Sequence, residues 1–304
     1  MIQPSIKNET AQLRKVVLGL AKDFGGVPAL EDSYDPKSKE HILAGTFPTQ
    51  ESVYTQMKNL KEVLLKHDVE IFRPSNVIGV NQVFARDIGF VIDNTFVVPN
   101  IIFERRKEVD ALASIIEQIP RKNILRAAEE FRFEGGDVMP WNEVLFVGYS
   151  KQEDFDKYKV SRTNEAGVGF LTEHFPNRKV IAVELKKSDT DAKQNSLHLD
   201  CIFQPIGINK AIIFKDGFKF ESDYKKIEDY FGADNLIQIS RDEMYNMNSN
   251  VFSISPSVII SGKSFTRLNA ILKELGFTVE EVEYDEISKM EGLFRCSTLP
   301  LVRA

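Results

Sequence analysis

The run Gly292-Leu-Phe-Arg-Cys-Ser-Thr-Leu-Pro-Leu-Val-Arg303 lies at the end of the 304-residue chain, and both the fold and the chemistry depend on how it is used. It reads as extended chain, and it carries Cys296, one of only two cysteines. A thiolate is the strongest nucleophile that a side chain offers near neutral pH, although most free cysteines are small buried hydrophobes. Cys296 is therefore a candidate nucleophile that needs support from the rest of the chain.

Upstream of this run, one order of elements recurs four times: a hairpin, then a helix, then a strand. The hairpins turn at 93–94, 142–143, 207–210 and 255–256. Helical spacing of apolar residues predicts helices over about 104–118, 165–175, 223–230 and 265–275. Strands are predicted near 124–125, 179–185, 236–239 and 278–284.

A fifth unit has to combine the two ends of the chain. The N-terminal part supplies a strand over 14–20, a helix that begins after Thr49, and a strand over 69–73. Its hairpin is complete only if the C-terminal run pairs with residues 14–20. Repetition at about 45–65 residues predicts a closed ring of five ββαβ-type modules in a single domain over 1–304. A doubly wound sheet is the alternative, but no glycine fingerprint follows the first strand.

Two segments interrupt this order. Residues 23–48 carry glycines, prolines and charges without periodicity, so we expect a long loop, either a functional lid or a surface excursion. Residues 151–159 read as a polar insertion.

Composition indicates an ordinary globular protein, with 42% hydrophobic and 28% charged residues. A net charge of −6 argues against nucleic acid or an anionic membrane as a partner and suits a cationic small molecule. Two cysteines cannot form a disulfide framework, so we expect a reducing, cytoplasmic environment. The first residues lack the pattern of a signal peptide, and no apolar run reaches membrane-spanning length.

A polar or reactive residue stands where each hairpin opens. These residues are Asp87, Asp137, Asp200, Asn250 and Cys296. If the modules surround an axis, equivalent positions converge on it and share one pocket. The alternative is that these side chains only cap turns, as Asp and Asn often do. We favour a shared site because the set includes both a cysteine and a nearby histidine.

His198 is the strongest single candidate for proton transfer. It lies two residues before Asp200, so on a strand both side chains would point to the same face. Cys201 would then point to the opposite face as a core residue. The other three histidines lie in polar sequence and are expected to be solvated. A Cys–His metal site is poorly supported because neither cysteine belongs to a CxxC pair.

With these residues in view, the chain resembles the guanidino-modifying enzymes: arginine deiminases, dimethylargininases and amidinotransferases. The matching stretches occur in the family's order and span almost the whole chain. They are Phe84-Ala-Arg-Asp87, Glu134-Gly-Gly-Asp-Val138, Ser161-Arg-Thr-Asn164, His198-Leu-Asp200 and Arg295-Cys-Ser-Thr-Leu-Pro300. The resemblance implies a five-bladed α/β propeller, the pentein fold, with the active site on its axis.

The resemblance also implies a role for each matched residue. Cys296 would attack the guanidinium carbon and form a covalent thiouronium intermediate. His198 would protonate the departing amine and then activate the second nucleophile, while Glu134 keeps it basic. Asp87 and Asp200 would bind the guanidinium nitrogens, and Arg162 the α-carboxylate. No metal or organic cofactor is implied.

These features predict a cysteine-dependent enzyme acting on arginine or an arginine-like compound, with hydrolysis preferred. Two alternatives stay open: an amidinotransferase, in which an amine replaces water, and a non-catalytic propeller that only binds, as the ribosome anti-association factors do. The presence of Asp200 resembles the deiminases and amidinotransferases more than the dimethylargininases. The sequence leaves the oligomeric state open, a homodimer included.

Overall fold

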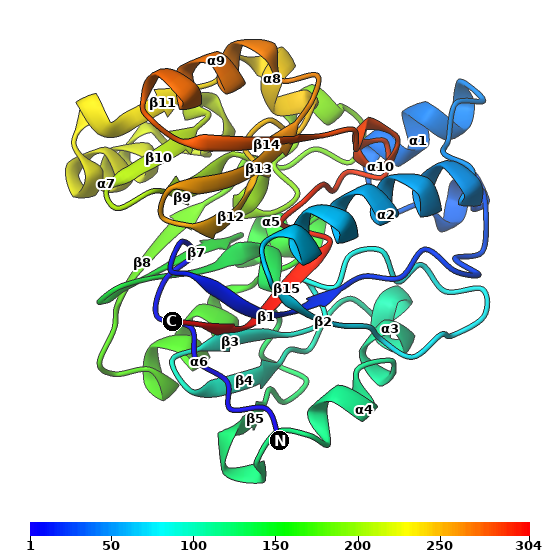
Figure 1. Cartoon of the computed structure of the whole chain (residues 1–304), viewed down its shortest axis with the longest axis horizontal. Coiled ribbons are helices and arrows are strands. Elements are labelled where there is room, and N and C mark those ends of the chain that lie inside the picture. Colours follow the sequence, from blue (N-terminus) through cyan, green and yellow to red (C-terminus); the bar gives the residue numbers. More distant parts are fainter.

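The computed structural model describes all 304 residues and shows five small sheets of three strands each (Figure 1). The four sheets formed in chain order consist of β3 (Phe90–Ile92), β4 (Thr95–Val98) and β5 (Ile124–Arg126); β6 (Val138–Trp141), β7 (Val144–Tyr149) and β8 (Lys179–Glu184); β9 (Phe203–Ile206), β10 (Lys210–Ile213) and β11 (Leu236–Gln238); and β12 (Phe252–Ser255), β13 (Val258–Gly262) and β14 (Thr278–Val282). The fifth contains β15 (Thr298–Arg303), β1 (Leu13–Leu18) and β2 (Glu70–Phe72).

Every sheet repeats one connection pattern. An antiparallel pair is followed by a helical crossover to a third strand that runs parallel to the middle one. The crossover helices are α2 (Gln50–Lys66), α3 (Arg106–Asp110) with α4 (Ala113–Ile116), α6 (Glu165–His174), α7 (Glu221–Phe231) and α9 (Thr266–Glu274). This pattern confirms the ββαβ module predicted from the sequence, so the doubly wound sheet was the wrong alternative.

The ring closes where the two ends of the chain meet. β15 pairs antiparallel with β1, with Val17 opposite Leu299, and β2 adds in parallel to β1. β15 also contacts β3, and β1 contacts β12, so the fifth sheet lies between the first and the fourth. Figure 1 shows it in the middle of the molecule, with β3–β5 below and β12–β14 above. The predicted fifth hairpin is thereby confirmed.

Local sequence explains the positions of these elements. The Thr49 hydroxyl accepts the backbone N–H of Ser52 and starts α2. The helix then buries its apolar positions Val53, Met57, Leu60 and Leu64. Asp93 and Asn142 adopt positive φ at their hairpin turns, which Asp and Asn tolerate better than most residues.

Three predictions about helices need correction. Residues 23–48 are not entirely loop, because they contain the 3-10 turn Leu30–Asp32 and the helix α1 (Pro36–Leu43). Asp35 caps that helix, and Pro36 suits its first turn, but its eight residues show no apolar period to reveal it. The helix expected over 104–118 is broken into α3 and α4, and the insertion at 151–159 contains α5 (Gln152–Lys157).

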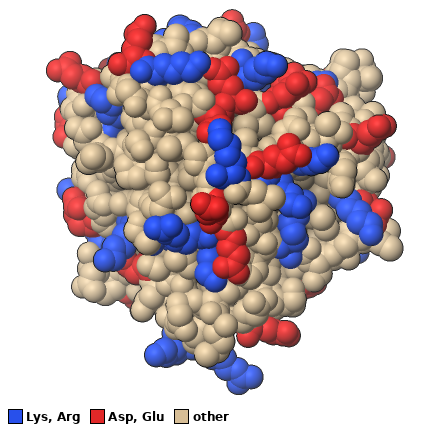
Figure 2. All heavy atoms as spheres, viewed as in Figure 1, with Lys and Arg blue, Asp and Glu red and all other residues tan.

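Most buried apolar side chains form one continuous cluster that runs through several modules, with two smaller clusters beneath the first and second sheets. On the face shown in Figure 2, acidic and basic side chains are intermixed rather than segregated. None of the helices is both long and apolar enough to span a bilayer.

Closure of the ring predicts that shortening a side chain at the closing pair weakens the whole domain. Leu299 is fully buried beside Val17, so we expect Leu299→Ala to lower the free energy of unfolding by about 2–5 kcal/mol. Chemical denaturation followed by circular dichroism should show one transition at a lower midpoint. Leu65→Ala, at a position 52% exposed on α2, serves as the control and should change stability little. A second transition, or an unchanged midpoint for Leu299→Ala, would contradict closure as a source of stability.

Candidate active site

A tight turn precedes the inner strand of each hairpin, and these turns carry the reactive residues singled out from the sequence. The 3-10 turn Gly135–Asp137 leads directly into β6. The 3-10 turn Leu199–Cys201 ends just before β9. Turns before β3, β12 and β15 carry Asp87, Asn250 and Cys296. Hydrogen bonds join these turns to one another, and Asp87, His198 and Cys296 reach a cavity of about 780 Å³.

Cys296, His198, Asp87 and Arg162 line this cavity, while Glu134 and Asp200 lie fully buried just behind its wall. No hydrogen bond joins the sulfur to the imidazole directly. All six residues predicted for the site are therefore found at one place, although their chemical roles stay a prediction.

His198 is positioned by a turn and not by a strand, so the expected strand alternation with Asp200 was wrong. It is the residue before the 3-10 turn Leu199–Cys201, and β9 begins only at Phe203. Its ring packs directly on Gly136, where a Cβ atom would come within 2.6 Å of the imidazole. Cys201 is buried in the core, as predicted.

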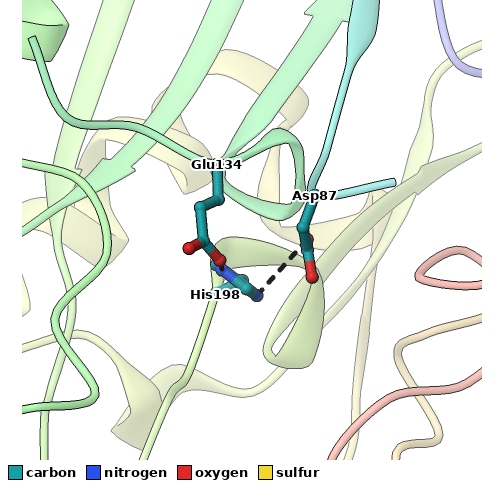
Figure 3. A group of neighbouring side chains, drawn as sticks. All are labelled: Asp87, Glu134 and His198. Atoms are coloured by element: carbon teal, nitrogen blue, oxygen red, sulfur yellow. Dashed lines mark hydrogen bonds and ion pairs between the residues drawn. The ribbon is translucent and has the colours of Figure 1, made fainter. Parts of the chain in front are cut away.

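Two carboxylates hold the imidazole from either side (Figure 3). Nε2 of His198 lies 2.9 Å from Oε2 of Glu134, and Nδ1 lies 3.8 Å from Oδ1 of Asp87. Burial lowers the pKa of His198, but Asp87 and the hydrogen bond to Glu134 outweigh it, so the net pKa lies above the ordinary value. The free site therefore favours the imidazolium more than water does.

Glu134 is the carboxylate that receives the most donors in the site. Besides His198, its Oε2 accepts from Arg162 at 3.1 Å and from Arg105 at 3.4 Å. Burial raises its pKa, but Arg162, His198 and Arg105 together lower it well below the ordinary value. Glu134 is therefore ionised throughout the neutral range.

The environment of Cys296 favours the thiol. Its sulfur lies 3.5 Å from Oδ2 of Asp200 and accepts the side-chain N–H of Asn250 at 3.2 Å. Burial, together with the nearby Asp200 and Asp87, raises the pKa of the thiol well above its ordinary value. A cation that binds next to the sulfur would oppose this effect.

Asp200 is held from behind by a second buried ion pair. Arg295 donates to Oδ2 of Asp200 at 3.0 Å and to both carboxylate oxygens of Glu9, at 3.1 Å each. Burial raises the pKa of Glu9, but Arg295, together with Arg86 and Arg303, outweighs it and lowers the pKa to about 2. Glu9 comes from the N-terminal segment, so both ends of the chain contribute to this support.

Arg162 lies on the loop before α6, where the resemblance placed it. One of its terminal nitrogens bonds Glu134, and the other donates to the backbone carbonyl of Tyr34 at 3.4 Å. The Tyr34 ring also faces this guanidinium, at 5.4 Å. Segment 23–48 thus lies directly against a predicted substrate-binding residue and lines the cavity, as a lid would.

The sequence reasoning missed Arg105 and Glu108, which line the same cavity. Arg105 donates to Asp87 at 2.7 Å and forms two 2.8 Å bonds to Glu108. The only signal was an arginine three residues before a glutamate, a spacing that also occurs on exposed helices. It therefore gave no reason to expect a buried pair.

Among the buried polar atoms at the cavity without a hydrogen-bond partner are Oδ1 of Asp87, an acceptor, and Nε of Arg162, a donor; Oε2 of Glu291 is a third. Unsatisfied buried groups are costly, and at a cavity they indicate contacts that a ligand could complete. An N–H group suits the first and an oxyanion suits the second.

The site also has a set of potential metal ligands. Atoms of Asp87, Glu134 and His198 lie within 4.8 Å of one another. Arg105 bonds both carboxylates, and Arg162 bonds Glu134, so two guanidinium groups already occupy the positions that a cation would need. This donor arrangement fits a metal poorly.

A five-sheet ring with these turns at its centre is the architecture of the guanidino-modifying pentein superfamily, and comparisons with known proteins show that the chain is a member. Residues 44–303 match the family model described as N,N dimethylarginine dimethylhydrolase, eukaryotic. The chain belongs to this family.

Among curated proteins, the chain is 29% identical to the uncharacterized protein YkgA of Bacillus subtilis over 298 residues, which is 98% of this chain and 94% of YkgA. It is 27% identical to an arginine deiminase of Listeria monocytogenes, over 73% of this chain and only 61% of the deiminase. The chain thus matches only part of the length of the deiminases.

Two solved structures share the fold. The N-terminal domain of ArgZ, a cyanobacterial arginine dihydrolase solved with bound substrate, superimposes with a TM-score of 0.79 at 18% identity and covers 95% of this chain and 98% of that domain. SxtG, an amidinotransferase of saxitoxin biosynthesis from Microseira wollei, superimposes with a TM-score of 0.77 at 17% identity. This match covers 99% of this chain and 97% of SxtG. At such low sequence identities, the structural similarity shows only that the fold is shared.

The geometry predicts that Glu134 keeps His198 protonated. Glu134→Gln removes the negative charge and leaves only a neutral amide oxygen as a possible acceptor, so we expect the pKa of His198 to fall by about one unit or more. Titration of the imidazole signals by NMR measures this directly. Glu280→Gln, which removes the partner of His67 at the surface, is the matched control and should leave the His198 titration unchanged. Equal titration of His198 in the native and Glu134→Gln proteins would refute the assignment.

Proposed function

We propose that this protein is a cysteine-dependent hydrolase of the guanidino group of arginine or an arginine-like compound, with all 304 residues forming one catalytic unit. The observation that carries the proposal is the single cavity that presents Cys296, His198 and an unpaired oxygen of Asp87 to one small ligand. The family supports the guanidino group as the target, and the ArgZ domain was solved with its substrate bound.

Binding of the cation comes first. The guanidinium would donate to the open oxygen of Asp87 and lie over the sulfur of Cys296, next to the Asp200 carboxylate. Two carboxylates then fix its plane and supply orientation. At the other end, the free Nε of Arg162 would receive the α-carboxylate of an amino acid.

The same cation would activate the nucleophile. Without ligand, two carboxylates near the sulfur disfavour a thiolate, whereas a bound guanidinium offsets their charge. The thiol proton then leaves to solvent as the substrate enters. Reactivity is in this way restricted to the substrate-bound state.

The covalent steps follow from the protonated His198. Cys296 attacks the guanidinium carbon, and the imidazolium gives its proton to the departing amine, which leaves a thiouronium. A water molecule then attacks the same carbon while neutral His198 takes one of its protons. The C–S bond breaks, the sulfur leaves as thiolate, the oxygen gives its remaining proton to solvent, and a ureido product remains.

An amine in place of that water would give amidino transfer. Both outcomes share the first half of the reaction, so the final acceptor is decided by what reaches the intermediate. An assay with glycine or another amine present separates them by looking for an amidinated product.

The test is a substrate panel of arginine, its methylated derivatives and agmatine, scored for ureido product and released amine. We expect turnover of at least one compound and a loss of at least about 10³-fold in Cys296→Ser, because a hydroxyl is a far weaker nucleophile at neutral pH. Cys201→Ser is the matched control at the other buried cysteine and should remain active.

Two results would speak against the proposal. One is a folded native protein that turns over none of the compounds, with or without an amine acceptor. The other is a Cys296→Ser variant as active as the native enzyme. Either result would favour a ring that only binds its ligand.

Recognition of the α-carboxylate gives a separate prediction. Arg162→Gln should raise KM for arginine by about 10- to 100-fold, as expected for loss of a charged hydrogen bond, with less effect on agmatine, which lacks that carboxylate. Steady-state kinetics with both substrates measure the difference. Lys159→Gln, at an exposed cation on the cavity rim, is the control. An equal effect of Arg162→Gln on both substrates would assign Arg162 to the support of Glu134 alone.

A further inference from the structure

Asn250 stands at the same point of its module as the reactive residues of the other four, yet the function proposed above gives it no role. It lies in the turn before β12, and its side chain is fully buried. A buried carboxamide needs partners for both its oxygen and its nitrogen. In this structure the oxygen and the nitrogen each pair with Cys296, and the nitrogen also donates to the backbone carbonyl of Asp200 at 3.4 Å.

The contacts are reciprocal. Oδ1 of Asn250 accepts the backbone N–H of Cys296 at 3.2 Å, and Nδ2 donates to the sulfur at 3.2 Å. The first bond determines which way the amide faces, because only its oxygen can accept an N–H. The amide nitrogen is thereby directed at the sulfur.

The turn that carries Asn250 is itself restrained. Its backbone N–H bonds the carbonyl of Met247 at 2.9 Å, and its own carbonyl accepts the N–H of Arg295 at 3.4 Å. The amide is thus held in place before any ligand arrives.

We propose that Asn250 is a further catalytic residue, which stabilises the Cys296 thiolate through its side-chain N–H while leaving the site free of added positive charge. The assignment rests on the proposed role of Cys296 as the nucleophile. When the sulfur is a thiol, it donates to Asp200 and accepts from Asn250. When it is ionised, the Asp200 contact becomes repulsive and the Asn250 bond becomes charge-assisted and stronger.

The neutrality of this donor matters for a cationic substrate. A lysine, arginine or histidine beside the sulfur would stabilise a thiolate more strongly, but it would also repel a guanidinium and compete for Asp87. A carboxamide donates one N–H to the sulfur and does not titrate. It therefore favours the thiolate without weakening the binding of the cation.

Asn250→Asp is the decisive variant. It keeps the shape and an acceptor for the Cys296 N–H, but it replaces the donor with a negative charge. We expect kcat to fall by about 10- to 100-fold with KM changed less than about threefold, and alkylation of Cys296 by iodoacetamide to shift to higher pH by about one unit or more. Iodoacetamide is neutral, so its pH profile reports the sulfur and not the binding of a cation.

Ser249→Ala is the matched control, since it removes a buried bond to the Asp200 carbonyl from the adjacent residue without touching the sulfur. It should retain the native kcat and alkylation profile. If thermal unfolding shows that Asn250→Asp does not fold, Asn250→Ala decides instead, because it removes the donor without adding charge. A native alkylation profile and kcat in the folded variant, or equal losses in Ser249→Ala, would overturn the assignment.

The alkylation profile requires no substrate, so the two proposals can fail separately. If Asn250→Asp shifts the profile while the native protein turns over no guanidino compound, Asn250 still stabilises the sulfur and the proposed function is the one that fails. If the native protein is active and the profile does not move, the role of Asn250 is refuted alone.

Discussion

The structure depends above all on the pairing of buried charges around the centre of the ring. Glu9 and Asp200 share Arg295, while Asp87, Glu108 and Glu134 share Arg105. A single buried carboxylate without a partner would cost several kcal/mol, and would ionise only at raised pH. These pairs link turns from different modules, so the charge balance and the closure of the ring stabilise each other.

The same balance explains how a buried cysteine can be both inert and reactive. The guanidinium groups of Arg105, Arg162 and Arg295 are each bonded to a carboxylate, and none of them stabilises a thiolate at Cys296. A guanidinium ligand would bring the missing positive charge to the sulfur. Under the proposed function the substrate would supply the missing charge, while burial and the two aspartates favour the thiol before it binds.

The sequence predicted the repeat, the closing pair and the set of residues at the centre, because each has a local signature. Hairpin turns such as that at Asp93 can be recognised from the residue types that turns require. The run around Cys296 could pair only with residues 14–20, because every other hairpin was already complete. The partners of Arg105 and Arg295 had no such signature, since they lie up to 286 residues apart in the chain and meet only after folding. For the same reason the turn that carries His198 was mistaken for a strand: its geometry is set by packing on Gly136, from another module.

The two aspartates beside the sulfur show how repeated modules can form a site whose two sides differ. Asp200 has Oδ2 held by Arg295 and lies behind the wall of the cavity, whereas Asp87 has Oδ2 held by Arg105 and Oδ1 without a hydrogen-bond partner, 3.8 Å from Nδ1 of His198. Equivalent positions in two modules thus give one fixed charge and one free acceptor. A planar cation that enters such a site meets different partners on its two sides, which determines which of its faces lies toward the sulfur. Five similar turns can therefore form an asymmetric centre, because it is enough that each turn carries a different residue at one equivalent position.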